Sequence, residues 1–433
     1  MEKHTSDSKT GTVLIKQVKI ADPGSIHNNQ TVDIFISDGI IAKIGKLNLN
    51  AETILEPNGL VATPGLFDLR TRHGEPGQEQ DEDVNSLIKT AYYGGFSGLA
   101  TLPNTEQTIQ SRAQIEYLIR KAENKPVNVY PLGATTVDLQ GKELAELFDM
   151  HQGGAIGFSN GDNPYNSGCL QRALLYTKNF NGLIFSHAEE KNLSNDGFIN
   201  ESDNTAALGL KPFAAHAEYI AIGREIEIAR YTNSKLHFSH ISSAKSIELI
   251  RKAKEDGLNI TCDVSILHLI YNDEVLKSFD ANLKLMPPIR NEIDRLALID
   301  GVNDGTIDCI VSDHNPHCPE NKVVEFNYSP FGAITLQIVF SLYTQFLSQS
   351  ISIDSFVKAA SINPRHILGL PTANIEENKP ANLSVFDINK EWTLTKKTNK
   401  SLSSNTHFLN SKLTGQCVFM ANGKISKLLN KLN

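Results

Sequence analysis

The chain has 433 residues, of which 40% are hydrophobic and 21% are charged, and its net charge at pH 7 is −8. This composition is too apolar for a disordered chain, and the surplus of acidic residues argues against nucleic-acid partners and against a polybasic membrane surface. The length fits one α/β barrel of roughly 250 residues or more together with a smaller domain.

The five cysteines are scattered and form no Cys-x-x-Cys pair, which indicates reduced thiols rather than a disulfide framework. No run approaches the ~20 apolar residues of a membrane span, and the N-terminal segment is polar. We therefore expect a cytoplasmic protein.

The two ends of the chain differ from its middle in their pattern of apolar and polar residues. Residues 1–60 and 380–425 alternate apolar and polar residues between Gly, Asn and Asp breaks, which is typical of short strands. Between them, apolar β-type runs alternate with amphipathic helical stretches, as in βαβ units. The sequence predicts a small β-sandwich domain from residues 1–62 and 370–433, and a (β/α)8 TIM-type barrel from residues 63–369.

Eight strands and five helices are predicted for the barrel. The strands are expected at 60–70, 96–103, 128–134, 154–159, 182–187, 235–240, 259–264 and 306–314. The helices are expected at 81–93, 111–124, 214–231, 243–256 and 291–302.

Polar residues stand where three predicted strands end. His187 and His240 each close a strand, and Asp313 closes the last one. Because barrel strands meet at their carboxyl ends, these side chains are expected to converge, and imidazole and carboxylate groups are suitable zinc ligands. The alternative is that each is a hydrogen-bonded residue at the barrel rim.

Several motifs together resemble one known family. PGLFDLRTRHGEPGQEQDED, GGFSGLATLPNT, LKLMPPIRNEIDRLALIDGVNDGTIDCIVSDHNPH and NPRHILGL are similar to dihydroorotases of the zinc-dependent class in the amidohydrolase superfamily. The resemblance implies a barrel enzyme of pyrimidine biosynthesis, which hydrolyses the cyclic amide of dihydroorotate or closes the ring of carbamoyl aspartate. In that family a zinc-bound hydroxide attacks the carbonyl and an aspartate transfers the proton.

The chain departs from the family where the metal should bind. The family's His-x-His-x-Arg motif falls on Arg70, Arg72 and Gly74, so two zinc ligands are arginines and the arginine that grips the substrate carboxylate is missing. The strand-four acids fall on Asn160 and Gly161, although a one-residue slip would bring Asp162 into place. The asparagine usual before PPxR is Met286.

Other family positions are kept. By the resemblance, His187, His240 and Asp313 are remnant zinc ligands, with Asp313 also the catalytic base, and Asn104 and His317 contact substrate. His73 adjoins the missing pair, but a one-residue shift turns a side chain to the other face of a strand. Arg290, Asp294 and Arg295 are expected to form a solvated ion-pair group.

Three hypotheses follow. The first is a dihydroorotase-like chain that has lost catalysis and has a structural role beside aspartate transcarbamoylase, as a homodimer or in complex. The second is an active cyclic amidohydrolase with a single zinc ion, and the third is an anion-binding protein without enzymatic activity.

Charge favours the first hypothesis. At ~4 Å and an effective dielectric constant near 20, each unit of like charge costs about 4 kcal/mol, and a divalent ion doubles that cost. Zinc is therefore expected to be absent, or present as at most one ion. We further predict that the guanidinium of Arg70 or Arg72 pairs with Asp313 in place of the metal; the alternative is that both turn to solvent.

Overall fold

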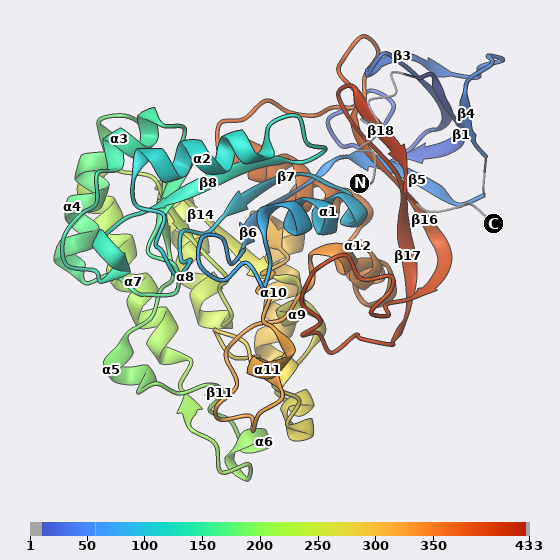
Figure 1. Ribbon diagram of the computed structural model, residues 1–433. Helices are drawn as coiled ribbons and strands as arrows, with labels where there is room; N and C mark the ends of the chain where they lie inside the picture. The colour runs from blue at the N-terminus through green and yellow to red at the C-terminus, as the bar shows by residue number, and fades with distance from the viewer. Residues whose placement is uncertain (1–10, 57, 430–433) are drawn as a thin grey trace.

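Eight parallel strands form a barrel at the centre of the molecule (Figure 1). The computed structural model describes residues 11–56 and 58–429. A bridge between Thr71 and His314 joins the last strand to the first. The predicted fold class is confirmed. The barrel strands, in chain order, are β6 (Leu66–Thr71), β7 (Phe96–Thr101), β8 (Asn128–Ala134), β9 (Gly157–Ser159), β10 (Ile184–Ser186), β13 (Leu236–Phe238), β14 (Ile260–Ser265) and β15 (Cys309–Val311).

The run 60–70 was expected to be one strand, and this expectation is wrong. It divides at Gly65 into β5 (Leu60–Pro64), which pairs with the C-terminal part of the chain, and β6, which begins the barrel. A Cβ atom at Gly65 would lie 2.4 Å from Ser97 Oγ and 2.5 Å from Asn382 Oδ1, so the crossing between the two sheets requires glycine.

Helices surround the barrel, and the five that were predicted are present within a few residues of their expected bounds. The longer ones are α1 (Val84–Gly94), α2 (Arg112–Ala122), α4 (Ser167–Lys178), α7 (His216–Thr232), α8 (Ala244–Glu255) and α10 (Glu292–Asp304). Shorter ones are α3 (Leu147–Gln152), α5 (Lys191–Ser194), α6 (Asp203–Ala206), α9 (Ile266–Ile270), α11 (Pro319–Lys322), α12 (Val339–Leu342), α13 (Ile353–Val357) and α14 (Asn363–Ile367).

Single 3-10 turns or π-helical turns connect several of these helices. They are η1 (Val137–Leu139), η2 (Asp273–Ser278), η3 (Ala281–Leu283), η4 (Leu336–Ile338), η5 (Tyr343–Leu347) and η6 (Lys358–Ile362). None of the helices in the described ranges is long and apolar enough to cross a membrane.

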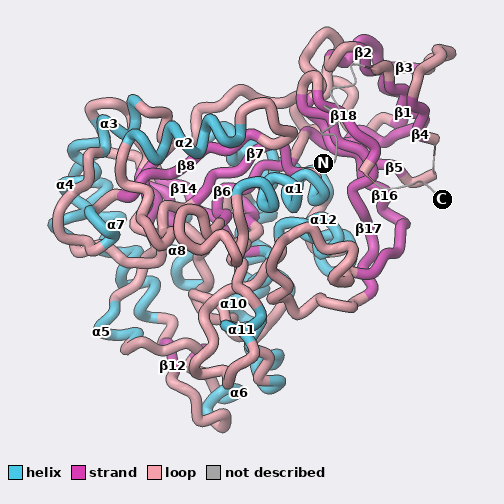
Figure 2. The backbone as a smooth tube through the Cα atoms, in the orientation of Figure 1, coloured by secondary structure: helices cyan, strands magenta, loops and turns pink. Residues whose placement is uncertain are grey.

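Strands from both ends of the chain pair into one further sheet beside the barrel (Figure 2). Its order is β18-β17-β16-β5-β1-β2-β3, with β4 paired to β1. This terminal sheet has a hydrophobic core separate from that of the barrel. Its strands are β1 (Val13–Ile20), β2 (Thr31–Ser37), β3 (Ile40–Gly45), β4 (Thr53–Leu55), β5, β16 (Asn382–Thr393), β17 (Lys412–Asn422) and β18 (Ile425–Leu428); a separate pair is β11 (Ile199–Asn200) with β12 (Pro212–Phe213).

Candidate functional site

Charged side chains converge at the carboxyl ends of the barrel strands, the end where barrel enzymes place their active sites. Each lies at the end of its strand or in the loop directly after it. This mouth cluster comprises Arg70 and Arg72 from β6, Asp162 after β9, His187 after β10, His240 after β13 and Asp313 after β15.

Arg70 is the centre of the mouth cluster. Its side chain is 2% exposed, its Nε donates to Asp313 Oδ1 at 2.8 Å, and its Nη2 donates to Asp162 Oδ1 at 2.6 Å. Arg72 donates to the other oxygen of Asp162. The predicted pairing of an arginine with Asp313 is confirmed, and both guanidinium groups point into the barrel mouth rather than to solvent.

The pKa values of Asp162 and Asp313 shift in opposite directions. Burial alone would raise the pKa of Asp162, but the charges of Arg72 and Arg70 outweigh it and hold that pKa below its ordinary value. For Asp313, burial dominates and raises the pKa, in spite of the opposing effect of Arg70. Asp162 therefore stays ionised to a lower pH than Asp313.

His187 and His240 contact each other. His187 Nδ1 lies 2.8 Å from His240 Nε2, and His187 Nε2 lies 3.3 Å from Glu189 Oε2. Burial lowers the pKa of His240 well below its ordinary value, and the charge of Arg70 lowers it further. A neutral His240 that donates from Nε2 uses the lone pair of His187 Nδ1, which leaves the His187 Nε2–H to donate to Glu189.

These residues do not fit a zinc ion. A zinc site needs several lone pairs directed at one point, whereas here one histidine nitrogen bonds to the other and the Asp313 carboxylate accepts from Arg70. Across residues 11–56 and 58–429, no three or more His, Cys, Asp or Glu side chains are grouped so that they could hold a metal ion.

The backbone has an unusual shape at two residues of the mouth cluster. His240 has φ +42° and Asp313 has φ +54°, in the left-handed region that non-glycine residues rarely adopt. Such strain typically marks positions where a side chain must be aimed precisely. Both side chains are thus still turned towards the barrel mouth.

The resemblance matches Gly74 to the family's carboxylate-binding arginine, and a side chain at this position would collide with the backbone. A Cβ atom there would lie 1.8 Å from the carbonyl oxygen of Gln78, because the backbone closes a tight turn in which Gln78 N donates to Gly74 O at 2.6 Å. The loss is therefore a change of loop shape as well as of residue.

His73 does not replace the missing histidines. Its ring is 5% exposed and neither ring nitrogen has a hydrogen-bond partner among the described residues. Burial lowers its pKa to about 4, and the carboxylates that act on it are Glu75 and Glu82, which lie outside the mouth cluster.

The sequence left open whether Asp162, rather than Asn160 or Gly161, reaches the barrel mouth, and the loop after β9 shows that it does. Asn160 is buried and turned away, with its Oδ1 accepting from Thr136 Oγ1 at 2.6 Å and its Nδ2 donating to Leu139 O. Gly161 has φ +63° and turns the chain, so that Asp162 reaches the mouth cluster. Asp162 binds arginines there.

The residues matched to substrate contacts are only partly available. Asn104 Oδ1 is buried without a partner in the described part of the chain. His317 Nε2 lies 2.8 Å from Phe331 O, so its ring donates to a loop carbonyl. Met286, half-buried, replaces a polar contact with a thioether.

Asp68 was missed by the sequence analysis. It is fully buried in β6, where its Oδ1 accepts from Ser312 N at 2.9 Å and its Oδ2 accepts from Thr71 Oγ1 at 2.6 Å. Burial raises its pKa to about 6. Asp68 thereby fastens β6 to the loop after β15, and the only signal in the sequence is an acid within an apolar strand.

The comparisons with known proteins agree with this architecture. A family described as "Dihydro-orotase-like" matches residues 59–246. A dihydroorotase of Caldicellulosiruptor saccharolyticus is 37% identical and is aligned over 97% of this chain and 100% of the relative. One of Acetivibrio thermocellus is 34% identical over 95% and 98%, respectively.

Solved structures with the same fold include a hydantoinase and a dihydropyrimidinase. The L-hydantoinase of Arthrobacter aurescens has a TM-score of 0.82 at 18% identity, covering 97% of each chain. The dihydropyrimidinase of Brevibacillus agri has a TM-score of 0.79 at 18% identity, covering 95% of this chain and 94% of the other. Sequence identities of 34% and 37% over nearly the full length of both chains show that this chain belongs to the dihydroorotase family.

Proposed function

We propose that this chain is a non-catalytic member of the dihydroorotase family. The supporting observation is that Arg70 binds Asp313, the carboxylate matched to the catalytic base, while the two remnant histidines bind each other. The Asp313 oxygen that accepts from a guanidinium has its lone pair directed at Arg70, so it is less available to take a proton from water or substrate.

The substrate side supports the same proposal. The tight turn at Gly74 leaves no side chain to hold the carboxylate of dihydroorotate or carbamoyl aspartate. The two arginines do not form a substitute anion site, because Asp162 and Asp313 already neutralise their charges. This balance argues against the anion-binding alternative.

Zinc content and turnover test the proposal. We expect far less than one zinc ion per purified chain, and dihydroorotate hydrolysis at background level with zinc added. The double variant Arg70→His/Arg72→His should bind zinc more tightly, because it removes two cations and adds two imidazoles. The same variant with Asp313→Ala is the control and should lose that gain.

Two zinc ions per wild-type chain, or turnover above about 1 per second, would contradict the proposal. A double variant that binds no more zinc than the wild type would show that the arginines do not exclude the metal.

We also propose that the chain acts through protein contact, as a homodimer or beside aspartate transcarbamoylase. The support is the family resemblance combined with a site that no longer fits the family's metal. Light scattering after co-expression should reveal a dimer or a shared complex, and a monomer that never co-elutes with the transcarbamoylase would contradict this.

A further inference from the structure

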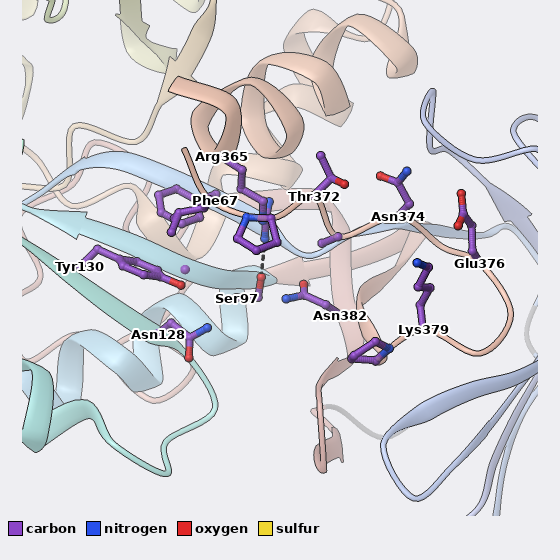
Figure 3. A pocket seen from close by; sticks show the side chains of 15 residues that line it. Phe67, Ser97, Asn128, Tyr130, Arg365, Thr372, Asn374, Glu376, Lys379 and Asn382 are labelled. Carbon is purple, nitrogen blue, oxygen red and sulfur yellow. Dashed lines mark hydrogen bonds between the residues drawn. The ribbon is translucent and has the colours of Figure 1, made fainter. Parts of the chain in front are cut away.

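A cavity of about 450 Å³, drawn in Figure 3, is lined by residues at the starts of three barrel strands, and the mouth cluster lies at the other end of the strands. It is bounded by the first residues of β6, β7 and β8 and by the segment 370–382, which leads from the barrel to the terminal sheet. This volume falls within the range of ~300–1,000 Å³ that is typical of small-molecule sites.

Arg365, in α14, lines this cavity and is 5% exposed. Its Nη1 donates to the carbonyl of Ser361 at 2.6 Å and to its hydroxyl at 2.9 Å. Its Nη2 donates to Gly65 O and to Ser97 Oγ, both at 2.8 Å. These bonds use all four Nη hydrogens, whereas the Nε–H has no acceptor among the described residues.

All the oxygens that Arg365 contacts are uncharged. Within the described ranges no carboxylate lies at ion-pair distance from it, and burial lowers its pKa to about 10, so that it still carries its charge at neutral pH. A buried cation without a counter-charge is costly, and a nearby anion would offset that cost.

Two aromatic rings stand beside Arg365, among polar lining residues. The guanidinium carbon lies 5.3 Å from the centroid of the Phe67 ring, and the Tyr130 ring is 5.5 Å from Phe67. Lys379 and Glu376 stand at the far end from Tyr130 (Figure 3). The cavity thus combines a cation that has no ion-pair partner in the described residues with the half-buried ring of Tyr130, since Phe67 is only 1% exposed.

We propose that this cavity binds a small organic anion, a carboxylate or a phosphate monoester, with its charge beside Arg365 and its apolar body against Tyr130. Nothing in this proposal depends on the chemistry of the barrel mouth, so the zinc and turnover experiments neither support nor damage it.

Calorimetric titration of the full chain tests the proposal with benzoate, phenyl phosphate and neutral benzamide. We expect saturable binding of at least one anion, at least tenfold tighter than that of benzamide and weaker at high salt. The anion that binds more tightly distinguishes a carboxylate ligand from a phosphate ligand. The proposal is overturned if neither anion binds saturably, or if benzamide binds equally well.

Variants locate the binding. Arg365→Gln should weaken the anion at least tenfold, and Thr372→Trp, which fills the cavity from an exposed lining position, should do the same without touching the buried hydrogen bonds. Lys379→Gln should weaken it by a smaller factor, and Lys396→Gln, an exposed lysine outside the lining, is the matched control. Unchanged affinity in folded Thr372→Trp would place the ligand elsewhere and overturn the assignment.

Discussion

Arg70 and Arg365 are buried arginines at opposite ends of the same barrel, and they differ in the charge around them. Arg70 donates to two carboxylates, whereas Arg365 donates only to carbonyl and hydroxyl oxygens. At the mouth, two carboxylates of the chain balance the two positive charges, although Arg70 Nη1 and Arg72 Nε have no acceptor in the described residues. At the other end the positive charge is unbalanced beside a cavity. Equal burial therefore gives a self-contained ion-pair cluster in one place and a candidate ligand site in the other.

Removal of Arg70 should give the largest loss of stability. Arg70→Met leaves Asp313 and Asp162 facing each other without their shared cation, and breaking a buried ion pair in this way costs about 3 kcal/mol or more. Urea denaturation measures the loss. Arg72→Met is the control, since Arg72 is 19% exposed and binds one carboxylate, and it should cost about 1 kcal/mol.

The double variant Arg70→Met/Asp313→Asn sharpens this result. It should recover part of the loss, because the unpaired carboxyl group is gone. Equal losses for Arg70→Met and Arg72→Met would show that Arg70 is not the centre of the mouth cluster.

Removal of Arg365 should cost less than removal of Arg70. Arg365→Met deprives the carbonyls of Ser361 and Gly65 of a donor, but it leaves no unpaired charge, so we expect about 2 kcal/mol. A thermal melt alongside Arg70→Met compares the two. If Arg365→Met proves the more damaging variant, the contrast between charged and uncharged partners is not what governs their stability.

The smallest effect concerns pH. The pKa of Asp162 is lower in the folded chain than its ordinary value. Its contribution to the free energy of unfolding is therefore fully present above the ordinary pKa and is lost as the pH falls through the folded pKa. Asp162→Asn should therefore reduce the acid sensitivity of the unfolding free energy below about pH 4, by roughly 1 kcal/mol for this one-third-exposed side chain. If the unfolding free energies of the wild type and the variant change equally with pH, Asp162 is not a source of the acid sensitivity.

Much of the barrel could be predicted because its signals are local. Apolar runs and amphipathic stretches locate the strands and helices. The two-residue period of a strand puts Arg70 and Arg72 on one face, which led to the pairing with Asp313. The position of Asp162 could not be settled in the same way, because it depends on the left-handed turn at Gly161.

Contacts between segments that are far apart in the sequence could not be predicted from local sequence patterns. Arg290 was expected to be solvated, and this is wrong: it is 2% exposed and donates to Asn200 Oδ1, Phe213 O and Ser242 Oγ. Asn200 and Phe213 lie in the long segment between β10 and α7, which no sequence motif predicts, and Ser242 lies in the loop after β13. The cavity beside Arg365 was missed for the same reason, since its lining joins three strands to the segment 370–382.

The turn at Gly74 has a consequence for protein engineering. Arg70→His and Arg72→His restore two imidazoles by exchange of side chains on an unchanged strand. An arginine at position 74 would instead collide with the Gln78 carbonyl, so the turn 74–78 must first be redesigned. Recovery of metal binding and recovery of substrate affinity are thus separate design problems. A variant that solves only the first would bind a metal ion without gaining a side chain that holds the substrate carboxylate.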